Sequence, residues 1–93
     1  MTVGILKVSL FIPQSNSLKA KRMVLHSIKA QLRNRFNVAL AQIDDEDKWQ
    51  KATLAIAGVE RDKRHMESVL SEVINFISEI QSAQLIEHQI ELL

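Results

Sequence analysis

The chain has 93 residues, of which 46% are hydrophobic and 25% are charged, and its formal net charge is +1 at pH 7. These proportions are typical of a soluble globular domain and exclude a disordered or collagen-like chain. Cysteine is absent, which excludes disulfides and thiolate catalysis. No run of about 20 uncharged apolar residues occurs, and no signal peptide is evident, so we expect a cytoplasmic protein with no membrane contact.

The near-neutral charge is the sum of two unequal halves. Residues 1–43 carry seven Lys and Arg and no acid, whereas residues 44–93 carry eleven acids and five Lys and Arg. This asymmetry favours an anionic partner for one end of the molecule.

The first half of the chain predicts a strand, a helix and a second strand. Residues 2–12 alternate as a strand whose fully apolar face is Gly4, Leu6, Val8, Leu10 and Ile12. Ser17 is a suitable N-cap for a helix from Leu18 to about Arg35, where apolar residues recur with a period near 3.6. A short strand is expected from Asn37 to Ile43.

The second half repeats this order. After an acidic turn at residues 44–47, the alternation from Lys51 to Val59 predicts a strand. Asp62 caps a second helix with apolar residues from Met66 to Ile80. Residues 85–93 form the last strand, with Ile86, Ile90 and Leu92 expected to point inward and His88 expected on the same side.

The resulting order is βαββαβ. Right-handed crossovers place the first and third strands side by side in the centre of the sheet. We therefore predict one α+β domain over residues 1–93, a ferredoxin-like sandwich with both helices on one face of a four-stranded antiparallel sheet.

The strongest functional pattern is a basic stripe on the first helix: Lys19, Arg22, His26, Lys29 and Arg33, spaced 3, 4, 3 and 4 residues apart. This spacing puts the five residues within about 80° of one helix face. The helix contains no acid, so intrahelical ion pairs cannot explain the stripe. Phosphate binding needs such a row of cations, and we predict RNA contact by Lys19, Lys21, Arg22, Lys29, Arg33 and Arg35. The alternative is a solvated face, partly neutralised by the acidic second helix.

The sheet surface turned away from the helices is too apolar to be left in water. RNA-recognition domains with this topology stack bases on aromatic residues there, but only Phe11 is available. We therefore predict a homodimer that forms through this surface, with Val3, Ile5, Ser9, Phe11, Ala55, Ala57 and Val59 in the interface. The alternative is a monomer in which the stems of Lys7 and Lys51 shield this surface.

Catalytic and metal motifs are missing. The acidic turn lacks the spacing and glycine of an EF-hand, and no nucleophile set, phosphate loop or zinc pattern occurs. We expect no enzyme activity, no metal and no cofactor. Trp49 is expected to close one end of the core, and His88 to be semi-buried.

Five short stretches together resemble the YlxP-like family of small bacterial proteins: Val3-Gly4, Ile12-Pro13, Ser17-Leu18-Lys19-x-Lys21-Arg22, Arg35-Phe36-Asn37-Val38 and Asp47-x-Trp49. The resemblance spans nearly the whole chain and implies a ferredoxin-like fold. Members are often encoded among translation and ribosome-maturation factors, which implies a role near RNA, and no catalytic residues are known. Ala20 departs from the family, where an acid usually follows Lys19, and its presence leaves the stripe more purely cationic.

These observations favour a non-enzymatic accessory protein that contacts structured RNA or a ribosomal particle. Two other hypotheses remain open: a protein–protein adaptor whose basic helix meets an acidic partner, and a regulatory module that binds a small ligand at the dimer edge.

Overall fold

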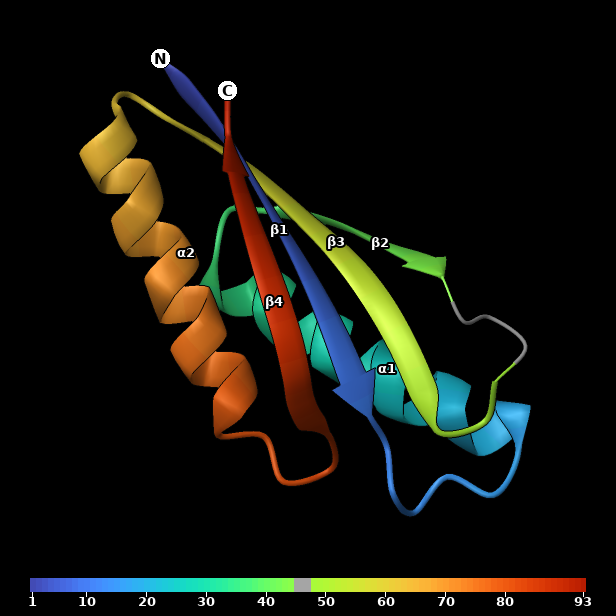
Figure 1. The fold of residues 1–93 in the computed structure, drawn as a ribbon. Helices are drawn as coiled ribbons and strands as arrows, with labels where there is room; N and C mark the ends of the chain where they lie inside the picture. Colours follow the sequence, from blue (N-terminus) through green and yellow to red (C-terminus); the bar gives the residue numbers. More distant parts are fainter. Residues whose placement is uncertain (45–47) are drawn as a thin grey trace.

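All six predicted elements occur in the computed structural model, which describes residues 1–44 and 48–93 (Figure 1). They are β1 (Thr2–Phe11), α1 (Leu18–Arg35), β2 (Ala39–Asp44), β3 (Lys51–Glu60), α2 (Lys63–Ser78) and β4 (Gln84–Leu92). The bounds of α1 agree with the predicted helix, and the strands differ from their predicted bounds by one or two residues.

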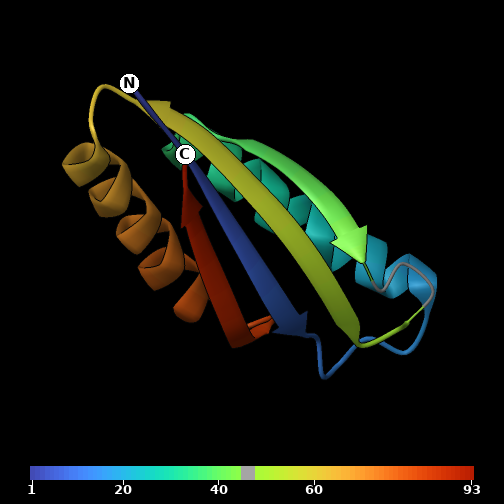
Figure 2. The ribbon, with the colours of Figure 1, turned by 45° about the horizontal axis from the view of Figure 1, so that its top comes forward.

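The four strands form one antiparallel sheet in the order β2-β3-β1-β4. The first and third strands are therefore central, as the crossover rule predicts. Both helices lie on the same side of the sheet, with α2 alongside β4 and α1 behind β3, which leaves the other side uncovered (Figures 1 and 2). This arrangement confirms the α+β ferredoxin-like fold.

The core lies between the sheet and the two helices. On β1 the predicted inward residues Leu6, Val8 and Leu10 have no exposed surface, and on β3 the same holds for Leu54 and Ile56. From the helices the core receives the buried side chains Leu25, Ile28, Leu32, Met66, Leu70, Val73 and Ile77. The period-2 and period-3.6 patterns thus identified the inward faces of these elements.

The helix starts are set by side-chain caps. Ser17 Oγ accepts a hydrogen bond from the backbone N–H of Ala20 at 3.0 Å, and Asp62 Oδ1 accepts one from the backbone N–H of His65 at 2.9 Å. Each bond satisfies a donor that the first helical turn cannot pair internally, which confirms both predicted N-caps.

Gly4 lets α2 approach β1 closely. A Cβ built at Gly4 would lie 2.5 Å from Met66 Cγ and 2.9 Å from Met66 Sδ, both inside van der Waals contact. The glycine is therefore required by packing between the strand and α2.

On β4 the predicted orientation is confirmed in part. Ile90, His88 and Leu92 are the register partners of the buried residues Leu6, Val8 and Gly4, so they lie on the helix side of the sheet, and Leu92 packs against the core. Because β4 is an edge strand, Ile90 is still 46% exposed and His88 is exposed, so the prediction of a semi-buried His88 is wrong. Ile86 falls at the register shift between Ser9 and Leu10 and is 55% exposed.

Trp49 is 56% exposed and so does not close the core. That end of the core is occupied instead by Ile12, which is 1% exposed.

Across the part of the chain that the structure describes, neither helix combines the length and apolar character that crossing a bilayer requires.

Candidate nucleic-acid interface

The basic face of α1 consists of Lys19, Arg22, His26, Lys29 and Arg33. Four of these residues are exposed and Lys29 is half-buried. Within residues 1–44 and 48–93, none of the five side chains forms a hydrogen bond or ion pair. Among the described residues, this face thus has no ion-pair partner that would neutralise its charges, as a phosphate-binding surface requires.

Lys21 does not belong to this face. Its side chain is 2% exposed, and its ammonium group donates a hydrogen bond to the backbone carbonyl oxygen of Lys48. The prediction that Lys21 contacts RNA is therefore corrected: this lysine joins α1 to the chain that leads into β3.

The spacing between Lys21 and the apolar residues of α1 indicates this buried position, which the sequence analysis missed. Residues 18, 21, 25, 28 and 32 follow one another at intervals of 3, 4, 3 and 4. Leu18 is half-buried and the other four are buried, and Lys21 is the one polar residue among the five. A lysine flanked on one helix face by Leu18 and Leu25 must pack its methylene stem against the core.

Arg35 also lies away from the basic face. Its guanidinium carbon is 4.5 Å from the centre of the Phe76 ring in α2, a cation–π contact. Gln31 and Arg35 line a shallow pocket with Phe76 and Glu79, so this side of α1 faces α2. Arg35 is therefore held between the helices, although its side chain remains exposed.

The position of Arg35 also shows where the basic face points. At about 100° per residue, Arg35 lies about 160° around the helix from the centre of the basic face. The basic face is thus on the side of α1 remote from α2, which removes the proposed neutralisation by the acidic second helix.

Trp49 is exposed although the backbone on both sides of it is anchored. The Lys48 carbonyl accepts the hydrogen bond from Lys21, the Gln50 carbonyl accepts one from Ile12 N–H at 2.8 Å, and Gln50 Nε2 donates to the Pro13 carbonyl at 3.1 Å. These bonds hold Trp49 at the end of the sheet near the start of α1.

The open face is the sheet surface turned away from the helices, and it includes every residue predicted for the dimer interface. The register places Val3 opposite Val59, Ile5 opposite Ala57, Lys7 opposite Ala55 and Ser9 opposite Thr53. Phe11 lies at one end of this set, opposite Lys51. On β2, Ala39 and Ala41 continue the surface, and a register shift after Gln42 displaces Ile43 from the alternation.

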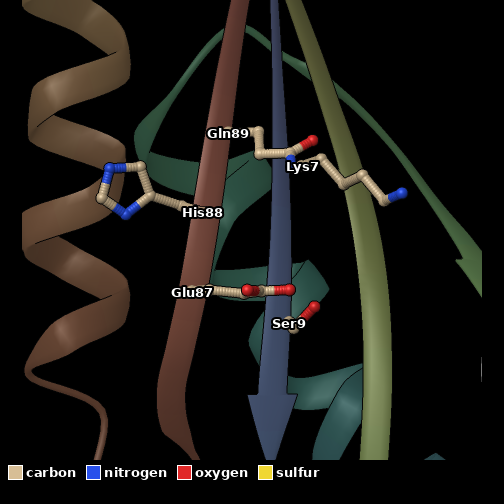
Figure 3. A pocket seen from close by; sticks show the side chains of 5 residues that line it. All are labelled: Lys7, Ser9, Glu87, His88 and Gln89. Atoms are coloured by element: carbon tan, nitrogen blue, oxygen red, sulfur yellow. The ribbon is translucent and has the colours of Figure 1, made fainter.

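The rim of the open face is polar. On β4, Glu87, Gln89 and Glu91 are the register partners of Ser9, Lys7 and Ile5. Figure 3 shows Lys7, Glu87 and Gln89 around a shallow pocket, whereas His88 points away from them toward α2. Two adjacent strands therefore carry opposite charges on this surface.

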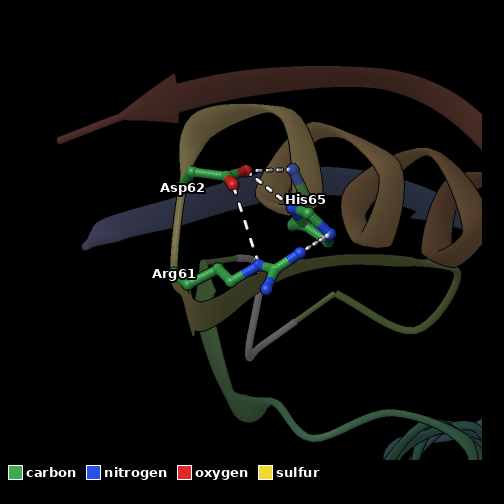
Figure 4. Close-up of polar contacts among 3 residues, drawn as sticks. All are labelled: Arg61, Asp62 and His65. Atoms are coloured by element: carbon green, nitrogen blue, oxygen red, sulfur yellow. Dashed lines mark hydrogen bonds and ion pairs between the residues drawn. The ribbon is translucent and has the colours of Figure 1, made fainter.

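A third polar cluster lies at the start of α2 (Figure 4). The ring Nδ1 of His65 is 2.7 Å from Asp62 Oδ1, and an Arg61 guanidinium nitrogen is 3.1 Å from His65 Nε2. Because arginine can only donate, Nε2 accepts and Nδ1 carries the hydrogen that is donated to Asp62. The hydrogen bonds from the backbone and ring of His65 lower the pKa of Asp62 below its ordinary value of 3.8.

This cluster reinforces the N-cap and offers no metal site. Among the residues the structure describes, no three His, Asp or Glu side chains come together in a way that could hold an ion. Most of the acidic turn that was considered as a cation site, residues 45–47, lies outside the described residues.

Comparison with known proteins finds a family and a relative for which no activity is stated. Residues 3–90 match the family described as "Protein of unknown function (DUF503)". The chain is also 35% identical over 75 residues to the "Uncharacterized protein YlxP" of Bacillus subtilis (strain 168), covering 81% of this chain and 82% of that protein. The chain therefore belongs to the DUF503 family, which includes YlxP-like proteins and has no established function.

Proposed function

We propose that this protein is a non-enzymatic accessory factor that contacts structured RNA, alone or within a ribosomal particle, through the basic face of α1. Lys19, Arg22, Lys29 and Arg33 would contact phosphates, and His26 would lie among them. The observation that carries the proposal is the row of exposed cations on a helix that contains no acid and whose basic face lies on the side away from α2.

The dimensions of the basic face fit a nucleic-acid backbone. Lys19 and Arg33 are fourteen residues apart, so the row extends about 21 Å along the helix axis at about 1.5 Å per residue. A row of this length can contact several phosphates of a folded RNA without entering a groove. Recognition would depend on backbone shape and charge, because phosphate contacts carry no direct sequence information.

The test is binding to a structured ribosomal RNA fragment, measured by fluorescence anisotropy across a salt series. Four phosphate contacts, each contributing roughly 0.7 to 0.9, predict a slope of about −3 in a plot of log K against log salt. The double variant Arg22→Glu with Arg33→Glu should weaken binding and reduce that slope by about half. The matched control is Lys63→Glu with Arg64→Glu on α2, which changes the net charge equally. It should bind slightly more weakly than wild type, only through long-range electrostatics, with the slope retained.

Two results would contradict the proposal. The first is no binding at low salt, and the second is an equal loss for the α1 and α2 double variants, which would indicate nonspecific attraction by net charge. Either result would favour the adaptor hypothesis, in which the same face meets an acidic protein.

A further inference from the structure

The open face has the composition of a contact surface and is not covered by any described part of the chain. Its centre is formed by small or apolar side chains of β1 and β3, including Ile5, Ala55 and Ala57, which are half-buried. At one end Val59 is 55% exposed, and beyond the β2 register shift Ile43 is 42% exposed. A sheet surface with this many small and apolar side chains in a small domain is typical of an interaction site.

The open face carries charges of opposite sign on two neighbouring strands. Lys7 is exposed on β1, and Glu87 and Glu91 are exposed on the neighbouring β4. None of the three forms an ion pair within residues 1–44 and 48–93. Figure 3 shows the reason for Lys7 and Glu87: the Lys7 side chain extends toward β3, whereas the Glu87 carboxylate lies beside Ser9.

The size of the open face suits a small, specific interface. The four strands contain 10, 6, 10 and 9 residues, and at about 3.3 Å per residue and about 4.8 Å between strands they give a surface of about 550 Å². Two such surfaces in contact would bury about 1,100 Å² in total, which is close to the lower limit for stable protein–protein interfaces.

We infer that the occupant of the open face is a second copy of this chain, packed sheet to sheet about a twofold axis that runs across the strands between Lys7 and Ser9. This axis places Lys7 of one copy opposite Ser9 of the other copy. Glu87 is the register partner of Ser9 on β4, so it lies beside the same Lys7. Each Lys7 then pairs with Glu87 of the partner, and the contact occurs twice by symmetry. The same operation brings Ile5 of each copy toward Phe11 of the other, so that apolar residues meet beside the ion pairs.

In such a dimer the helices form the two outer layers. The basic face of α1 remains exposed on each copy, because α1 and the open face are on opposite sides of the sheet (Figure 2). The dimer would present two cationic surfaces on opposite outer sides. Dimerisation does not depend on RNA binding, and the two can be tested separately.

The test is the molar mass of the full chain, measured without RNA by light scattering after size exclusion over a range of concentrations. Wild type should be dimeric at tens of micromolar. Lys7→Glu and Glu87→Lys should each raise the dissociation constant at least about tenfold, because each places like charges opposite one another. The double variant Lys7→Glu with Glu87→Lys should restore dimerisation. Lys63→Glu, with the same charge change on α2, is the control and should remain dimeric.

A second variant tests the apolar centre. Ala57→Arg projects from the open face and leaves the core side of β3 unchanged, so its circular dichroism spectrum should match wild type while its mass falls to that of a monomer. Ser71→Arg on the exposed side of α2 is the control and should be dimeric. A wild-type chain that is monomeric at every concentration would overturn the inference. A dimer whose molar mass is unchanged by both Ala57→Arg and the charge reversals would overturn it as well, because the contact would then lie elsewhere.

Discussion

Replacing Lys21 by methionine removes the ammonium group and keeps most of the buried aliphatic stem. The hydrogen bond from Lys21 to the Lys48 carbonyl involves a charged donor, and such bonds contribute about 1.5–3 kcal/mol. Because Lys48 itself is exposed, water can rehydrate its carbonyl in the variant, and the lower value applies. We expect Lys21→Met to lower the free energy of unfolding by about 1.5 kcal/mol.

Lys21→Ala separates the polar contribution from the apolar one. Alanine loses three further buried methylene groups, each worth about 0.8 kcal/mol, so the total loss should be about 4 kcal/mol. The stability order is therefore wild type, then Lys21→Met, then Lys21→Ala. Lys19→Met, two residues earlier on the exposed side of α1, is the matched control and should change stability by less than about 0.5 kcal/mol.

Urea unfolding followed by circular dichroism measures these differences. With an m-value of about 1–2 kcal/mol per molar, Lys21→Met should lower the midpoint by about 1 M. Trp49 provides a local readout because it directly follows Lys48, and its emission should change in the folded Lys21 variants. A Lys21→Met protein at least as stable as wild type would refute the reasoning, since the cost of burying the ammonium group would then exceed the benefit of its bonds.

Three further predictions concern single side chains. Gly4→Ala should destabilise the fold by about 1–3 kcal/mol, because the added methyl overlaps the middle of the Met66 side chain; a thermal unfolding midpoint equal to that of wild type would contradict this packing role. Asp62→Ala should destabilise the protein at pH 7, where the wild-type carboxylate caps α2. Because the pKa of Asp62 is lowered from 3.8, its stabilisation is complete above that pH and is lost as the pH falls through the lower folded-state value. Wild type and variant should therefore converge in urea midpoint toward pH 2, and a difference that stays constant from pH 7 to pH 2 would contradict the assignment. Trp49→Ala should change the unfolding free energy by less than about 1 kcal/mol, since the indole is 56% exposed; a loss several times larger would show that Trp49 is a core residue.

Local patterns predicted the elements and their inward faces well. The alternation of Leu6, Val8 and Leu10 and the capping residues Ser17 and Asp62 were sufficient to assign β1 and both helix starts. These features depend on neighbours within four or five residues, so they can be detected in the sequence alone.

The basic face was predicted only in part. The spacing of Lys19, Arg22, Lys29 and Arg33 placed them on one face of α1, and the structure agrees. Lys21 and Arg35 were grouped with them because they are cations close by in sequence. Their actual surroundings, the Lys48 carbonyl and the Phe76 ring, come from segments 27 and 41 residues away.

Sequence patterns alone were sufficient to predict the βαββαβ order, most strand and helix faces that enter the core, and the row of cations on α1. Periodicity, caps and turn residues act over a few positions, and the geometry of a helix or strand then determines which side chains share a face. The three-dimensional structure was needed to show that Lys21 is an internal anchor, that Trp49 and His88 are exposed, and that the basic face points away from α2. Those outcomes depend on which distant segment lies beside each residue, and at the edges and ends of a sheet the local pattern does not specify that neighbour.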